Sequence, residues 1–140
     1  MSGAQHGAMV RLLLLLLLLA TGAAAQTERF YDAQGRSTGR AETRNGVTRF
    51  YDAQGRSTGR AETSGGAIRF YDARGRSAGR SENGRSYDAM GRSTGRAETH
   101  GGTTRLYDAQ GRSTGRIEDR GGSWRSYDAE GRATGRADRR

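Results

Sequence analysis

The sequence predicts an all-β protein made of tandem β-hairpins, arranged as a meander or a solenoid-like sheet. The motif Tyr-Asp-Ala-X-Gly-Arg occurs six times, with copies 20 residues apart except for one step of 16 residues between Tyr71 and Tyr87. Such a short fixed period is typical of architectures in which each unit packs against its neighbours. Glycine interrupts every stretch that could form a helix, and no apolar period of 3.6 residues appears, which argues against helical repeats. The motifs begin at Tyr31, Tyr51, Tyr71, Tyr87, Tyr107 and Tyr127.

Residues 1–25 predict a signal peptide helix that precedes the array. Arg11 is followed by a run of leucines at residues 12–19 and by a small-residue stretch that ends in an Ala-X-Ala pattern at Ala25. These are the three parts of a secretory signal, whereas a transmembrane anchor would need about 20 apolar residues. We therefore expect a secreted or periplasmic protein without a membrane anchor, in which residues 26–140 form six units. The chain has no cysteine, so neither disulfides nor a lipid-modified cysteine is expected.

Each unit predicts two strands and two turns. In the copy that starts at residue 49, strands are expected at residues 49–52 and 56–63. Between them, Asp52 occupies the first position of a type I turn and Gly55 the position that requires a left-handed backbone. This pattern predicts a three-residue hairpin with a glycine bulge, in which the aspartate caps the turn.

The second turn of each unit fixes the pairing register. A two-residue turn at Asn45 and Gly46 would place Arg40 opposite Tyr51. Gly-Gly or Asn-Gly steps give the same register in the later units, and they also place each Glu opposite an Arg, as in Glu42 opposite Arg49. The 16-residue step lacks two residues from each arm, so it keeps the register: Arg80 would still face Tyr87.

The register also predicts one irregularity in each unit. Tyr would alternate between the two faces of the sheet unless the strand alternation is broken once per repeat, and Gly59 and its equivalents sit where a bulge would do this. One stripe would then carry the Tyr side chains and the other Phe30, Phe50, Phe70 and Leu106. The second stripe lapses to Ser86 and Ser126, so we expect the sheet to fray toward its end.

Composition predicts marginal stability. After residue 25 only seven residues are Leu, Ile, Val or Phe, and a chain so poor in these residues and so highly charged lies close to the composition of disordered proteins. A largely disordered secreted chain therefore remains an alternative. Cross-strand Glu–Arg pairs and Arg–Tyr stacks are the expected sources of stability.

The aromatic and guanidinium groups form the candidate binding stripe. All 24 basic residues are arginine, and arginine forks suit carboxylates, phosphates and sulfates and stack on aromatic rings. A solvated charged face is the competing interpretation. The stripe consists of Tyr31, Tyr51, Tyr71, Tyr87, Tyr107 and Tyr127 with Arg40, Arg60, Arg80, Arg96 and Arg116.

Residues 45–56 resemble the YD repeat of the rearrangement-hotspot and teneurin-like proteins, through the order Gly-X-Thr, an aromatic residue and Tyr-Asp-X-X-Gly-Arg. The resemblance covers about residues 29–140. It implies β-sheet shells or stalks outside the cytoplasm, the carbohydrate binding that is proposed for some members, and structural roles for the Tyr and Gly positions. The chain departs from the family at the apolar residue after Gly-Arg, which is Ser57 or its equivalent here, and we expect a short array without an effector domain.

Nothing in the sequence predicts catalysis, a metal or a cofactor. The histidines are His6 and His100 alone, and no cysteine or lysine could act as a nucleophile. The repeated Asp and Glu do not follow the spacing of a calcium loop. Two functions are expected instead: a binding or surface-associated module for anionic or carbohydrate polymers of the cell envelope, or a self-associating structural β-repeat protein. Nucleic acid is not an expected partner of an exported chain.

Overall fold

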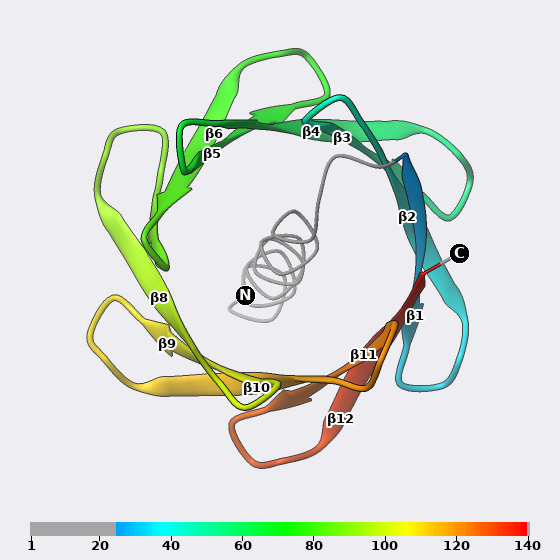
Figure 1. Ribbon diagram of the computed structural model, residues 1–140, viewed down its shortest axis with the longest axis vertical. Helices are drawn as coiled ribbons and strands as arrows, with labels where there is room; N and C mark the ends of the chain where they lie inside the picture. The colour runs from blue at the N-terminus through cyan, green and yellow to red at the C-terminus, as the bar shows by residue number, and fades with distance from the viewer. Residues whose placement is uncertain (1–24, 140) are drawn as a thin grey trace.

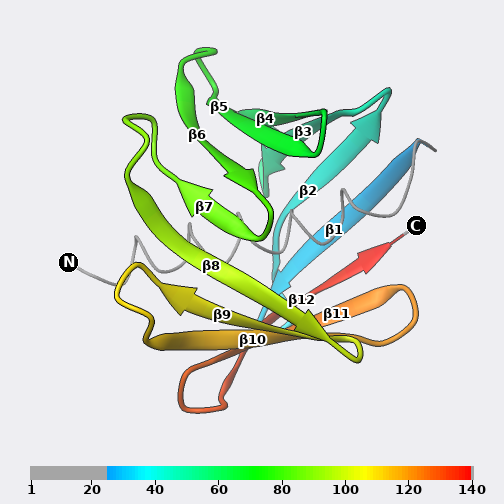
Figure 2. The ribbon, with the colours of Figure 1, turned by 60° about the vertical axis from the view of Figure 1, so that its left-hand side comes forward.

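Residues 25–139 are described by a computed structural model, in which the strands form one closed barrel. Each strand pairs antiparallel with the next along the chain, and the last strand returns to pair with the first (Figures 1 and 2). Within this part of the chain, no helix is long and apolar enough to cross a membrane. The predicted signal peptide lies outside the described residues, apart from Ala25. The strands are β1 (Gln26–Asp32), β2 (Ser37–Arg44), β3 (Val47–Asp52), β4 (Ser57–Ser64), β5 (Ala67–Asp72), β6 (Ser77–Glu82), β7 (Arg85–Tyr87), β8 (Ser93–His100), β9 (Thr103–Asp108), β10 (Ser113–Asp119), β11 (Ser123–Asp128) and β12 (Ala133–Arg139).

The six Tyr-Asp-Ala-X-Gly-Arg motifs form the turns that project outward round the barrel in Figure 1. In the copy between β3 and β4, the backbone N–H of Gly55 donates to the carbonyl of Asp52 at 3.0 Å. Gly55 has φ 82°, in the left-handed region that glycine adopts without strain. One carboxylate oxygen of Asp52 accepts hydrogen bonds from the backbone N–H groups of Gln54 and Arg56. The predicted glycine-bulge turn with an aspartate cap is therefore confirmed.

The two-residue turns also fold as predicted. Asn45 and Gly46 have φ 53° and 76°, as a type I′ turn requires. Arg40 lies opposite Tyr51, and the four other predicted hairpins keep the equivalent register. The shortened hairpin of β6 and β7 places Arg80 opposite Tyr87, so removing two residues from each arm leaves the register intact.

A bulge follows every aspartate turn, as the alternation of faces predicts. Phe50 pairs with Gly59 whereas Tyr51 pairs with Ser57, so Thr58 is the additional residue in β4. Gly59 has φ 148°, and a Cβ atom there would overlap the carbonyl oxygen of Tyr71. The bulge keeps tyrosine on the outer face and phenylalanine or its replacement on the inner face in every unit.

The sheet does not fray toward its end, contrary to the sequence-based expectation. Ser86 and Ser126, where the Phe stripe lapses, are buried inside the wall. The Ser126 hydroxyl donates to the carbonyl of Gly135 and accepts from the hydroxyl of Thr134, so it replaces apolar packing with hydrogen bonds. The predicted meander is thus correct, and closure is the feature that the sequence did not reveal.

The barrel closes at the seam between β12 and β1, which pairs like one more hairpin. Arg136 lies opposite Tyr31 and Ala137 opposite Phe30, the register that Arg40 and Ala41 have with Tyr51 and Phe50. The two ends of the described chain therefore occupy the place of a sixth two-residue turn.

In the part of the chain that the structure describes, the buried side chains of the inner face comprise seven apolar and six polar or charged residues. One apolar cluster runs along the wall from β9 through the seam to β2, with Phe30, Phe50 and Ala97 packed against it. The polar members include Thr48, Ser81 and Thr104. The cluster consists of Ala41, Leu106, Ile117, Trp124 and Ala137.

Candidate binding surface

Six arginine–tyrosine stacks encircle the outer face of the barrel. In the hairpin of β2 and β3, the guanidinium carbon of Arg40 lies 4.3 Å from the ring centre of Tyr51. The six distances span 4.2–4.6 Å, within the range of a cation–π interaction. Five stacks join the pairs that the sequence predicted: Arg40 on Tyr51, Arg60 on Tyr71, Arg80 on Tyr87, Arg96 on Tyr107 and Arg116 on Tyr127.

The sixth stack joins Arg136 to Tyr31 across the seam. Sequence reasoning paired arginines with tyrosines only across the two-residue turns, so Tyr31 had no partner and Arg136 was missed. Continuing the same register from the last unit to the first would have found this pair.

The carboxylate partner of each stacked arginine differs from the prediction. Glu42 lies opposite Arg49 in register, but its carboxylate accepts a hydrogen bond from Nε of Arg40, two residues away on the same strand, at 2.9 Å. Glu62, Glu98 and Glu118 repeat this arrangement at 2.9–3.1 Å. The predicted register of Glu opposite Arg is confirmed in all five hairpins, but the ion pairs run along the strand, from each glutamate to the stacked arginine.

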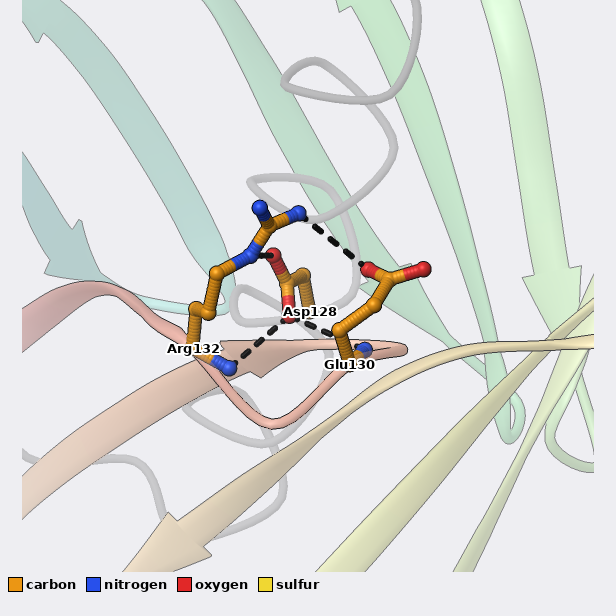
Figure 3. Close-up of polar contacts among 3 residues, drawn as sticks. All are labelled: Asp128, Glu130 and Arg132. Atoms are coloured by element: carbon orange, nitrogen blue, oxygen red, sulfur yellow. Dashed lines mark hydrogen bonds and ion pairs between the residues drawn. The ribbon is translucent and has the colours of Figure 1, made fainter.

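The aspartate turns supply a second set of ion pairs. Nε of Arg132 lies 2.8 Å from Oδ2 of Asp128, and a terminal nitrogen of the same guanidinium reaches Glu130 (Figure 3). The equivalent Asp–Arg pair recurs in all six turns. The pKa of Asp128 is lowered most by the hydrogen bond from the backbone N–H of Arg132; desolvation opposes this, and the Arg132 side chain lowers the pKa further. Each of these aspartates therefore stays ionised and holds its turn rigid.

Residues of β1 to β6 line a pocket of about 330 Å³ that opens to solvent. Its lining brings members of both predicted stripes together. Phenylalanine, tyrosine and arginine residues all contribute to this lining, and these residue types suit a sugar ring bearing an acidic group. The stripe residues in the lining are Phe30, Phe50, Phe70, Tyr51, Tyr71, Arg40 and Arg60.

A buried ion pair on the inner face marks the seam. Oε1 of Glu28 lies 3.4 Å from Nε of Arg139, whose guanidinium group also stacks 4.6 Å over the ring of Trp124. Desolvation raises the pKa of Glu28 from 4.5 to about 7, although Arg139 opposes this. The equivalent position in the hairpin of β2 and β3 holds a Thr43–Thr48 hydrogen bond of 2.7 Å. No sequence repeat pointed to this pair, because it breaks the repeat.

Within residues 25–139, no group of three or more His, Asp or Glu side chains is placed to hold a metal ion. No protein-family model matches the chain, and no curated protein is similar to it in sequence.

Proposed function

We propose that this protein is an exported, non-catalytic binding module for anionic or carbohydrate polymers of the cell envelope. The observation that carries this proposal is the ring of six arginine–tyrosine stacks on the outer face. The arginine side chains in these stacks keep 37–47% of their surface exposed, so both charge and aromatic edge face solvent. The sequence resemblance to YD repeats, for some of which carbohydrate binding is proposed, supports this function.

The pocket lined by β1 to β6 is the best place for tight contact with one unit of such a polymer. Its volume falls at the lower end of the range for small-molecule sites, and Tyr51, Tyr71, Arg40 and Arg60 contribute to its lining. A polymer that also runs along the outer face would contact several stacks at once, and such multivalency raises affinity without tight binding at any one of them.

Self-association, the alternative function, is less favoured by the fold. Stacking of hairpins between molecules needs a free strand edge, and every described strand has a neighbour on both sides.

The proposal is tested by binding of the purified protein to isolated envelope polysaccharide and to alginate, a uronate polymer, at increasing salt. We expect binding that weakens steeply with salt. The double variant Arg40→Gln/Arg60→Gln removes two stacks beside the pocket, whereas Arg96→Gln/Arg116→Gln removes two stacks elsewhere and serves as the matched control. A larger loss in the first variant supports the pocket as the main contact. Absence of binding by the unmodified protein to all these polymers contradicts the proposal.

A further inference from the structure

A second set of arginines forms a belt on the outer face that the stacks do not explain. Its members lie on the odd-numbered strands, two residues before each motif tyrosine, and all are exposed. Among the described residues, none of their guanidinium groups takes part in a hydrogen bond, ion pair or ring contact, unlike those of the stacks and of the aspartate turns. We call them the arginine belt: Arg29, Arg49, Arg69, Arg85, Arg105 and Arg125.

Each belt arginine faces a stacked arginine across the strand pair. Arg49 of β3 lies opposite Arg60 of β4, and Arg69 of β5 lies opposite Arg80 of β6. The other four pairs are Arg29 with Arg40, Arg85 with Arg96, Arg105 with Arg116 and Arg125 with Arg136. Like charges directly opposite destabilise a sheet, so this repeated juxtaposition opposes folding of the unliganded barrel.

Nearby carboxylates form ion pairs with the stacked arginine of each pair and with none of the belt arginines. Glu62 lies opposite Arg69 on the other side of β5, but its carboxylate is held by Arg60. The shortened hairpin of β6 and β7 has lost four residues, yet it retains Arg85, which lies opposite Arg96 of β8. The position is thus filled by arginine in all six units, including the one whose hairpin is shortest.

We infer that the arginine belt, together with the stacked arginines opposite it, binds a linear polyanion bearing phosphate or sulfate groups. A tetrahedral oxyanion between two guanidinium groups accepts paired N–H donors from both and removes their repulsion. Four stacked arginines, Arg40, Arg60, Arg96 and Arg116, donate Nε to a glutamate, which leaves their terminal nitrogens for such an anion. This inference rests on the proposed function and narrows its ligand to charge-dense polymers.

The geometry of the wall sets the length of the ligand. Successive belt arginines lie two strands apart, which is about 10 Å at the usual spacing of paired strands. A short anion therefore reaches one Arg–Arg pair, and a chain of several tens of Å can engage the whole belt. Affinity should rise steeply with chain length and then level off.

The experiment compares two double variants that remove the same charge. Arg49→Gln/Arg69→Gln changes two neighbouring belt positions, whereas Arg44→Gln/Arg74→Gln changes two exposed arginines outside the belt. Binding of the purified proteins to tripolyphosphate, long-chain polyphosphate and dextran sulfate is measured by calorimetry over a salt series. Alginate provides the carboxylate polymer for comparison.

We expect long-chain polyphosphate or dextran sulfate to bind much more tightly than tripolyphosphate, and the preferred polymer distinguishes phosphate from sulfate. The belt variant should lose about tenfold in affinity and show a shallower salt dependence, while the control loses less than about threefold. Without ligand, the belt variant should unfold at an equal or higher temperature than the unmodified protein, because it loses like-charge pairs.

Three results overturn the inference. Equal losses in both variants would show a general effect of net charge, and a lower unfolding temperature of the belt variant would show a structural role. Binding to alginate or envelope polysaccharide without binding to phosphate or sulfate polymers would refute the belt as such a site while leaving the proposed function intact.

Discussion

At the scale of single residues, the glycine of each bulge is the least replaceable position in the repeat. Gly59 combines φ 148° with a backbone carbonyl in the space of a Cβ atom, so Gly59→Ala must displace β5 or abolish the bulge. We expect a loss of at least about 2 kcal/mol in the free energy of unfolding, since strained backbone and a steric overlap add together. Denaturant unfolding of the variant measures this loss.

Gly65→Ala is the matched control for that variant. Gly65 has φ 58°, but a Cβ atom there would have open space around it, so only the left-handed backbone opposes alanine. The expected loss is about 1 kcal/mol. Equal losses in the two variants would contradict the role given to the close approach between Gly59 and Tyr71.

Residue-level contacts were predictable from the sequence only where backbone register decides them. The pairing of Arg40 with Tyr51 follows from turn length, and the structure confirms it. The partner of Glu42 does not follow from register, because a long guanidinium side chain that lies flat on a ring can direct Nε along its own strand. Side-chain conformation, rather than strand pairing, therefore determines these ion pairs.

At the scale of the hairpin, two residues can be removed from each arm, but one residue cannot be removed from each arm. Hydrogen-bonded and non-hydrogen-bonded pairs alternate along an antiparallel ladder, and a two-residue turn is compatible with only one kind. Deleting Thr63, Ser64, Ala67 and Ile68 converts the hairpin of β4 and β5 to the length of the natural short one. We expect a folded protein that is about 1–2 kcal/mol less stable, because the side chain of Ile68 is lost from the inner face.

Deleting only Ser64 and Ala67 tests the same rule from the other side. The two-residue turn then adjoins the kind of strand pair, of the two that alternate along the ladder, with which it is not compatible. This smaller deletion should therefore cost more stability than the larger one. Thermal unfolding followed by circular dichroism compares the two. A smaller loss for the two-residue deletion would refute the rule.

At the scale of the whole molecule, closure of the barrel could not be predicted from the repeat alone. Turn chemistry and glycine placement predicted the hairpins, their register and their bulges. Whether the twelve described strands form an open sheet or a ring depends on strand tilt and stagger, which the repeat leaves undefined. The seam pair of Glu28 and Arg139 joins residues at opposite ends of the array. At the equivalent positions, the other repeats have different residue types.

The seam should make the stability of the barrel depend on pH. The pKa of Glu28 is raised in the folded protein, so its favourable contribution is complete below about pH 4.5 and is lost as the pH rises to about 7. A rise of this size corresponds to about 3 kcal/mol. The six turn aspartates have lowered pKa values, so their contribution is lost only as the pH falls below the ordinary value of 3.8. We therefore expect maximal stability near pH 4–5.

Glu28→Gln should remove most of the loss of stability between pH 5 and pH 7 and leave the loss of stability below pH 3.8 unchanged. The unfolding free energy measured across this range provides the test, and Glu42→Gln on the outer face is the control. An unchanged slope in Glu28→Gln would contradict a buried carboxyl at the seam.

Closure also predicts that the chain can be opened at a different turn. In a ring, the seam is equivalent to the two-residue turns, since Arg136 and Tyr31 have the register of every Arg–Tyr pair. In the permutant, an Asn-Gly link replaces Gln26 and joins Arg140 to Thr27. The new chain begins at Gly66 and ends at Gly65. It would have the same twelve strands and six stacks. We expect its unfolding midpoint to lie close to that of residues 26–140, because one turn is gained and one is lost. In an open sheet the same permutation would separate strands that normally pair and would create no new pairing, so a large drop in the midpoint would refute the closed barrel.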